Sequence, residues 1–364
     1  MALEILGMVG TKEASEIKGS RESDGAVDAD YLRRFAQAHE AAGFDRVLIG
    51  YGATSPDGWA VAAAVLFSTE RLRVLIAHRP GFVQPTLVAR KAATLDNLTG
   101  GGRVAIHFIT GGDESDQARD GDYVAHDDRY RRTAEYMGII RQTLTSEKPF
   151  DHNGEFYRYE GAYSTVKPAT ALGIPLYFGG ASAPAVLAGA ANADVYMLWG
   201  EPRAAIAERI GEVREVASTF GRSPRFSLSV RPIVGPTEEA AWARAEEIAE
   251  LTAERVGRSE WRTRTKSSSV GSARLQEFAT NSDIHDERLW TKVTALTGPG
   301  GNSTALVGTA EQVAESILRY HDLGVTSILI RGFDPLEDVV LWGKELVPLL
   351  REGAATRELS LASR

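Results

Sequence analysis

The chain has 364 residues, of which 43% are hydrophobic and 25% are charged, and its formal net charge is −8. This size and composition are typical of one large α/β domain or two medium ones in a globular protein. The negative charge, and the lack of a basic stripe with interleaved aromatic residues, disfavour a nucleic-acid partner. The sequence has no cysteine, which excludes disulfides, thiolate metal ligands and a cysteine nucleophile.

Signals for secretion, membrane insertion and metal binding are weak. The N-terminal stretch MALEILGMVGTKEASEIKG lacks a basic start and a long apolar core, so we expect no signal peptide. No apolar run approaches the roughly 20 residues that cross a bilayer. The histidines are scattered, without the spacing of a metal site, so we expect no metal. These features favour a cytoplasmic protein without a membrane partner.

Apolar runs typical of buried strands alternate with amphipathic runs typical of helices. Eight strands are predicted, over residues 3–9, 45–50, 72–77, 103–109, from 176, 194–198, 226–234 and 326–330. The helices predicted between and after them cover residues 31–42, 58–67, 85–98, 129–145, from 183, 202–219, from 238 after an N-cap at Thr237, from a capping box at Thr309, and 336–350. This alternation predicts the α/β class and a (β/α)8 TIM barrel.

Two segments interrupt the alternation. Residues 146–173 are predicted to form an insertion with a small hairpin, in which Glu155–Tyr159 is the main strand. Residues 258–303 are polar and rich in Ser, Thr and Gly, which is typical of a mobile lid or a disordered loop. We therefore expect one TIM-barrel domain over residues 1–364, with the insertion 146–173 and the lid 258–303.

In a TIM barrel the reactive side chains lie at the carboxyl ends of the strands. The predicted ends lack a pair of carboxylates for glycoside hydrolysis and lack a G-x-S-x-G nucleophile turn. Arginines at three of the ends predict one or two anionic ligands. The residues at these ends are Met8, Gly10, Tyr51 to Ser55, His78, Arg79, His107, Thr110, Gly179 to Ser182, Trp199, Arg231, Arg331 and Phe333.

The stretch from Ile174 to Glu201 predicts a strand, a Gly-rich turn, a helix and a second strand. Gly179 and Gly180 end the first strand, Ser182 occupies the N-cap position, and Pro184 lies in the first helical turn. Free amides and the positive end of the helix dipole make such a turn suitable for a phosphate. An ordinary capped turn between a strand and a helix would have the same pattern.

Several longer motifs resemble the bacterial-luciferase-like flavin monooxygenases, and within them the two-component alkanesulfonate monooxygenases that use reduced FMN. These motifs are RPGFVQPTLVARKAATLDNLTGGGRVAIHFITGGD, HDDRY, PLYFGGAS, YMLWGEP and STALVGT. The resemblance extends over about residues 3–350. It implies a TIM barrel with a mobile loop that matches residues 258–303.

The resemblance also implies which residues hold FMN. The turn of Gly180, Ala181 and Ser182, together with Tyr130, would bind the FMN phosphate. The side chains of His107 and Thr110 would lie along the flavin, and Trp199 would lie near the active site. For His107 the resemblance alone favours the flavin, because a lone histidine in an apolar strand is more often a core residue.

Other positions depart from the sulfonate enzymes. Ser55 replaces a cysteine, Arg231 replaces an Arg-x-His pair, and Phe333 replaces a tyrosine, with Arg331 two residues before it. The two arginines are predicted to clamp an anionic substrate, since guanidinium groups bind sulfonate, carboxylate and phosphate. Ion pairs with rim residues such as Asp334 or Glu201 are the structural alternative. His78 and Ser55 are candidates for a proton relay.

The leading functional prediction is a monooxygenase that uses O2 and reduced FMN from a separate NAD(P)H-dependent flavin reductase. It would oxygenate an organosulfonate and release sulfite and an aldehyde. One alternative keeps the flavin and changes the substrate to a sulfone or a sugar sulfonate such as sulfoquinovose. Two others are a deazaflavin-dependent oxidoreductase and a flavin-binding protein without catalysis. The resemblance further implies a homodimer or homotetramer.

Overall fold

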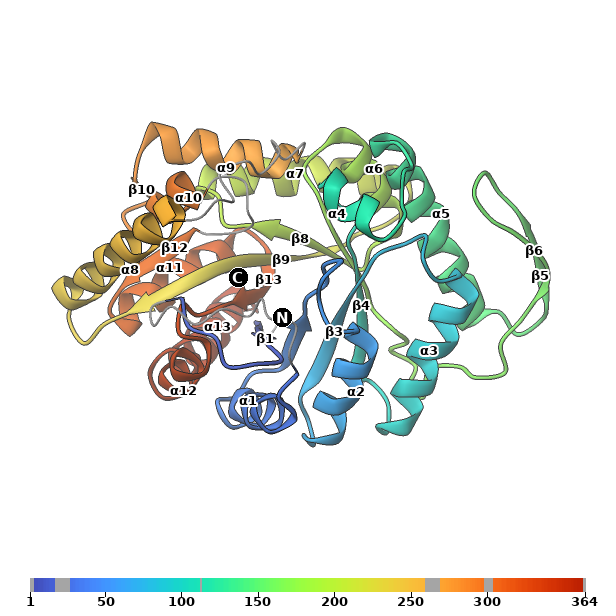
Figure 1. Ribbon diagram of the computed structural model, residues 1–364, viewed down its shortest axis with the longest axis horizontal. Helices are drawn as coiled ribbons and strands as arrows, with labels where there is room; N and C mark the ends of the chain where they lie inside the picture. The colour runs from blue at the N-terminus through green and yellow to red at the C-terminus, as the bar shows by residue number, and fades with distance from the viewer. Residues whose placement is uncertain (1–2, 17–26, 112, 259–268, 298–303, 363–364) are drawn as a thin grey trace. The chain divides into compact units, whose positions relative to one another are not determined.

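The computed structural model describes residues 3–16, 27–111, 113–258, 269–297 and 304–362 (Figure 1). Its contacts divide the chain into two compact units. Unit 1 is Met1–Val47, Met197–Glu212 and Arg225–Arg364; unit 2 is Leu48–Tyr196 and Val213–Pro224. The expectation of one domain with a lid stays a prediction. None of the described helices is long and apolar enough to cross a membrane.

Eight strands form a closed parallel barrel, which confirms the predicted fold class. Their order is β9-β13-β1-β2-β3-β4-β7-β8, and β8 pairs with β9. The bounds are β1 Glu4–Val9, β2 Arg46–Ile49, β3 Arg73–His78, β4 Val104–Phe108, β7 Leu176–Gly179, β8 Val195–Trp199, β9 Arg225–Val234 and β13 Val325–Ile330. All eight coincide with predicted strands to within a few residues, because each is an apolar run buried on both faces.

The helices also follow the predicted alternation. Asp28, Asp57 and Ser182 cap α1, α2 and α6, and Thr309 forms a complete capping box with Gln312 at α11. The bounds are α1 Ala29–Ala41, α2 Gly58–Phe67, α3 Pro85–Leu98, α4 Glu114–Arg119, α5 His126–Thr145, α6 Ala183–Asn192, α7 Arg203–Thr219, α8 Glu238–Arg258, α9 Val270–Asn281, α10 Lys292–Thr297, α11 Ala310–Asp322, α12 Pro335–Glu345 and α13 Val347–Ala362.

The insertion in unit 2 is a hairpin, as predicted, but its strands are displaced. β5 (Phe150–Asn153) pairs antiparallel with β6 (Arg158–Ala162), and Figure 1 shows the hairpin beside α5. Glu155 and Phe156 lie in the connection and not in a strand. The physical reason is Glu135 of α5, whose carboxylate accepts the amides of Phe156 and Tyr157 at 2.9 and 3.0 Å. These amides are therefore bound to a helix side chain and not to a ladder.

Strand β9 of unit 1 has ten residues and pairs with one strand of the barrel and with one strand outside it. Its first half pairs with β13, and residues Arg231–Val234 pair in parallel with β12 (Ala305–Gly308). β11 (Leu289–Trp290) and β10 (Ile284–His285) continue this outer sheet antiparallel. The sequence did not predict these three short strands.

The predicted lid 258–303 contains regular structure within its described part. Residues 269–297 carry α9, the β10–β11 hairpin and α10, while residues 259–268 and 298–303 lie outside the described residues. The expectation of a structureless loop was therefore wrong for 269–297, where Leu275, Trp290 and Val293 are buried. Whether this segment moves stays a prediction.

The expected final helix, 336–350, is two helices separated at Leu346. Pro348 explains the break. Its ring cannot coexist with a helical carbonyl four residues earlier, and it has no N–H to donate.

Candidate active site

Unit 2 contains a strand–turn–helix with the geometry of a phosphate cradle. Ser182 caps α6 by accepting the amide of Ala185 at 3.4 Å, and its hydroxyl shares a hydrogen bond with Tyr130. The Tyr196 hydroxyl donates to the Gly180 carbonyl at 2.7 Å, which fixes the turn. A Cβ on Gly180 would lie 2.5 Å from the Cβ of Ala185. The structure thus brings Gly180, Ala181, Ser182 and Tyr130 together at a helix N-terminus, where amides can bind an anion.

Two buried polar atoms without described partners lie in the same unit, one on β4 and one on α4. The Nδ1 atom of His107 is buried and unpaired among the described residues, and burial lowers the pKa of this histidine to about 4. The amide nitrogen of Gln117 donates to the Thr110 carbonyl at 2.9 Å, yet its Oε1 atom is also buried without a described partner. Thr110 shares a hydrogen bond with Thr133 at 3.2 Å. Because buried polar atoms are normally satisfied, this region fits a polar ligand such as the ring or ribityl chain of FMN.

The two proton-relay candidates occupy different environments. His78 is buried, and its Nε2 atom lies 2.8 Å from the Tyr136 hydroxyl, which itself donates to the Val83 carbonyl at 2.6 Å. Nε2 of His78 is therefore the protonated nitrogen that donates. Ser55 is exposed in a turn closed by its own amide to the Gly52 carbonyl at 2.9 Å. A proton role for either residue stays a prediction.

The arginines at the ends of β9 and β13, both in unit 1, bind a common carboxylate that the sequence did not single out. Arg231 binds Glu16 through both Nη atoms at 2.7 and 3.2 Å, and Arg331 reaches it at 3.2 Å. Arg231 also donates to the carbonyls of Gly332 and Arg331 at 2.8 and 3.4 Å and lies over the Phe333 ring. Ion pairing is therefore observed, with Glu16 in place of the considered Asp334 or Glu201.

Positive charges surround the carboxylate of Glu16. Burial raises the pKa of Glu16, but the charges of Arg231, Arg331 and Arg255 outweigh it and leave the pKa below its usual range. Three guanidinium groups therefore act on one carboxylate. Arg231 is 4% exposed, and its guanidinium is held by the hydrogen bonds given above, whereas the Arg331 side chain is 37% exposed. Arg331 is thus the member that can reach a further anion.

Trp199 ends β8 in unit 1, two residues before a second buried ion pair. Glu201 is 7% exposed and accepts Nε and Nη2 of Arg274 at 3.0 and 2.7 Å. The Tyr320 hydroxyl donates to the Glu201 carbonyl at 2.8 Å. Arg274 belongs to α9, so this pair attaches the 269–297 segment to the carboxyl end of β8.

A second cluster of charged residues that the sequence did not predict lies in unit 2, beyond the ends of β2 and β3. Arg79 pairs with Asp116 and Asp120, and the Tyr51 hydroxyl donates to Asp120 at 2.6 Å. Burial, then the hydrogen bond to Asp120, raises the pKa of Tyr51 to about 12. The sequence placed Tyr51 and Arg79 at strand ends, but α4, which contains Asp116 and ends just before Asp120, was not predicted. Arg79 is therefore neutralised within the protein.

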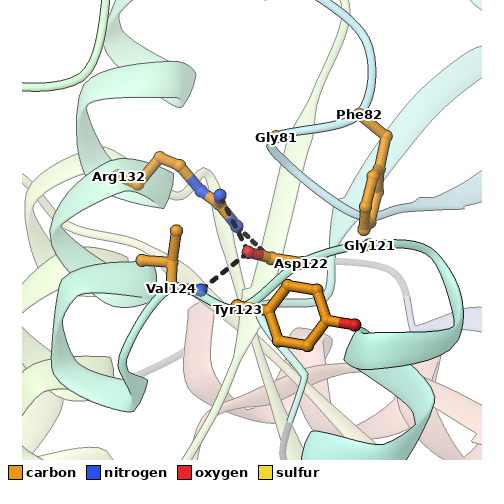
Figure 2. A pocket seen from close by; sticks show the side chains of 7 residues that line it. All are labelled: Gly81, Phe82, Gly121, Asp122, Tyr123, Val124 and Arg132. Atoms are coloured by element: carbon orange, nitrogen blue, oxygen red, sulfur yellow. Dashed lines mark hydrogen bonds and ion pairs between the residues drawn. The ribbon is translucent and has the colours of Figure 1, made fainter.

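An open pocket of about 340 Å³ lies beside this region (Figure 2). Its floor is the ion pair between Asp122 and Arg132, and Asp122 also accepts the amide of Val124 at 3.1 Å. The rings of Phe82 and Tyr123 border it, with Gly81 and Gly121. No predicted site residue is among the described residues that line it.

Acid is expected to destabilise the protein through three buried histidines. Burial lowers the pKa of His39 and His107 to about 4, and burial followed by the charge of Lys91 lowers that of His78 to about 3. Below pH 6.5 the unfolded chain therefore takes up protons that the folded chain excludes. Each histidine is expected to remove up to about 1.4 kcal/mol of unfolding free energy per pH unit between 6.5 and its folded pKa. Urea unfolding at about pH 7 and about pH 5 measures this difference.

A His39→Leu variant provides the matched comparison for this acid effect. Its unfolding free energy is expected to fall less steeply with decreasing pH. The difference in slope from the native protein is the contribution of one histidine. Equal stability of the native protein at the two pH values would contradict the burial of three neutral histidines.

Comparison with known proteins identifies the family. The model of the family described as luciferase-like monooxygenase matches residues 8–327. The chain belongs to this family. Membership in the luciferase-like monooxygenases agrees with the resemblance seen in the sequence, and it leaves the alkanesulfonate subtype as a separate question.

Solved structures similar to this luciferase-like chain share its fold at low identity. A riboflavin lyase (RcaE) with modified FMN and the substrate riboflavin is 21% identical, with a TM-score of 0.75 over 97% of this chain and 92% of its own. DmoA from Hyphomicrobium sulfonivorans is 20% identical, with a TM-score of 0.74 over 97% of this chain and 88% of its own. An F420-dependent secondary alcohol dehydrogenase is 19% identical, with a TM-score of 0.68 over 96% of this chain and 100% of its own.

Proposed function

We propose that the protein is a monooxygenase that uses O2 and reduced FMN to oxygenate an organosulfonate and release sulfite and an aldehyde. The observation that carries the flavin part is the cradle at α6 together with the unpaired buried atoms of His107 and Gln117. Membership in the luciferase-like monooxygenases supports the same reaction class. A separate NAD(P)H-dependent flavin reductase would supply the reduced cofactor.

When bound, reduced FMN would supply the electrons that activate O2. The protein would hold and orient this cofactor through its own amides and side chains. The amides at the α6 N-terminus and the hydroxyls of Ser182 and Tyr130 would bind the phosphate. The neutral imidazole of His107 would form a hydrogen bond to the flavin with its unpaired Nδ1 atom.

The substrate part of the proposal rests on the charge of the Glu16 cluster. The guanidinium of Arg231 already donates hydrogen bonds to Glu16 and to two carbonyl oxygens, and it stacks on Phe333. We therefore propose that Arg231 positions Arg331 and Phe333 and does not bind the substrate itself. Arg331 then offers its exposed guanidinium to the substrate anion. A sulfonate suits this role, since charge-assisted hydrogen bonds from guanidinium favour oxyanions.

The test mixes the protein and reduced FMN with O2 and measures sulfite across linear sulfonates, sulfoquinovose and a dialkyl sulfone. Sulfite is expected only with a sulfonate, reduced FMN and O2 together. Arg331→Gln is expected to lower kcat/KM for that sulfonate by about ten- to hundredfold, because the lost contact holds the group that leaves as sulfite. Arg33→Gln, at an exposed ion pair with Asp30, is the control.

Other results would redirect the proposal. Oxidation of the sulfone without sulfite release would keep the flavin and change the substrate. Binding of reduced F420 in preference to reduced FMN would instead favour the activity class of the F420-dependent dehydrogenase. Absence of turnover on every substrate, with tight FMN binding, would leave a flavin-binding protein.

A further inference from the structure

Glu16 is a carboxylate that unit 1 holds in place through both its side chain and its backbone. Its carboxylate accepts both Nη atoms of Arg231, on β9, at 2.7 and 3.2 Å. Its amide donates to the Phe333 carbonyl at 2.8 Å, and its own carbonyl accepts Nη2 of Arg255, on α8. Because three separate segments fix this residue, Glu16 presents a preorganised negative charge.

One oxygen of Glu16 is shared by two guanidinium groups. Its Oε1 atom accepts Nη2 of Arg231 at 2.7 Å and Nη2 of Arg331 at 3.2 Å. Among the described residues, this is the single hydrogen bond that the Arg331 guanidinium makes. Burial raises the pKa of Glu16, but the charges of the arginines outweigh it, so the carboxylate is ionised at neutral pH. Arg231 and Arg331 therefore lie close enough together for one small ligand to reach both.

The environment of Arg331 differs from that of Arg79, the arginine that follows β3. Arg79 is 4% exposed and pairs with two aspartate carboxylates. The Arg331 side chain is 37% exposed and shares one described carboxylate with Arg231, which binds both oxygens of that carboxylate. Arg331 can therefore bind a further anion, whereas the anion position on Arg231 is already filled by Glu16.

We propose that Glu16 is a specificity residue that restricts this site to a sulfonate without a second anionic group. It holds the place on Arg231 that a second acidic group of the ligand would need. A carboxylate a few carbon atoms away from a sulfonate on Arg331 would meet the ionised Glu16, and like charges placed side by side repel each other. This inference rests on the proposed function, because it takes Arg331 as the residue that binds the sulfonate.

The experiment compares two ligands of nearly equal shape, the singly charged 3-sulfopropanamide and the doubly charged 3-sulfopropanoate. Isothermal titration calorimetry without O2 gives the Kd of each, with and without reduced FMN. The native protein is expected to bind the amide at least about tenfold more tightly than the carboxylate. In Glu16→Gln this preference is expected to reverse, with a change of about hundredfold in the ratio of the two Kd values, since the carboxylate then reaches Arg231.

Thermal unfolding gives a second readout that a purely structural role of Glu16 would not alter. Glu16→Gln is expected to lower the Tm of the free protein, and 3-sulfopropanoate is expected to raise the Tm of this variant more than that of the native protein. The control is Asp30→Asn, which removes the partner of Arg33 on the surface and is expected to keep the native ratio of Kd values within about twofold.

Three results would overturn the proposal. They are an unchanged ratio of Kd values in Glu16→Gln, tighter binding of the carboxylate than of the amide by the native protein, and failure of the native protein to bind either ligand. If Glu16→Gln does not fold, Glu16→Asp takes its place. This variant keeps the negative charge, so it must keep the preference for the amide, and loss of that preference would contradict the role of Glu16.

The sulfite assay separates this inference from the proposed function. If no sulfonate yields sulfite while the ratio of Kd values still depends on Glu16, the selection by charge stands and the oxygenation of sulfonates fails. If sulfonates yield sulfite and Glu16→Gln keeps the native ratio, the proposed function stands and Glu16 has a structural role alone.

Discussion

Replacing Gly180 with alanine is expected to raise the Kd for FMN by about hundredfold. The added Cβ would lie 2.5 Å from the Cβ of Ala185 and 3.8 Å from the Tyr130 hydroxyl. The first turn of α6 must therefore shift away from the strand end, and the amides and the Ser182 hydroxyl shift with it. A loss of about 3 kcal/mol, from overpacking and from weakened contacts to the phosphate, corresponds to this change in Kd. Fluorescence titration of the apo-protein measures it.

Gly138→Ala is the matched control for Gly180→Ala. It adds the same methyl group in unit 2, within α5, where an added Cβ meets nothing within 4 Å. Alanine also has the higher helix propensity, so this variant is expected to bind FMN normally and to be more stable by up to about 1 kcal/mol. Normal FMN affinity in Gly180→Ala would show that the turn does not carry the phosphate.

The Glu16→Gln variant is expected to lose about 3 kcal/mol of unfolding free energy at neutral pH, because it removes the carboxylate that is hydrogen-bonded to the buried guanidinium of Arg231 beside Arg331. The side chains of Arg231 and Glu16 are 5% and 28% exposed, so solvent screens their pairing only in part. Urea unfolding at neutral pH measures the loss. The matched control is Asp30→Asn, whose partner Arg33 lies on the surface, and it is expected to lose less than about 0.5 kcal/mol.

The same ion pair has a defined dependence on pH. The pKa of Glu16 is lower in the folded chain than its ordinary value, so its stabilisation is complete above that value and is lost as the pH falls through the folded pKa. Glu16→Gln is therefore expected to approach native stability as the pH is lowered into that range. A constant difference at all pH values would show that the charge of Glu16 is not the source of its stabilisation.

The barrel could be predicted from the sequence because its determinants are local. Each strand is a short apolar run, such as LRVLIA before His78, and several helices begin at a capping residue in the expected position. The turn at Gly180 was predictable for the same reason, since glycines, a serine N-cap and Pro184 lie within a few residues of one another.

The features that the sequence did not predict depend on contacts between distant residues. Glu16 lies 215 residues from Arg231, and nothing in the short stretch around it marks a buried carboxylate. The helices within 269–297 are polar in sequence and are held by tertiary contacts, including the pair of Arg274 with Glu201. The burial of Arg129 could not be foreseen, because HDDRY is otherwise a typical acidic helix start.

The pairing of β9 with β12 has a consequence for how this protein can change in evolution. Arg231 and Ala305 are register partners, so the chain leaves the barrel along β9 and returns beside it through β12. The described elements between these strands, α8, α9, β10, β11 and α10, form a branch whose two ends are joined by backbone hydrogen bonds. Because β9 pairs with β13 through residues 226–230, ahead of the branch, insertions or deletions in the branch are expected to leave this register unaltered. We therefore expect this branch to tolerate changes in length and sequence more readily than the strands of the barrel do.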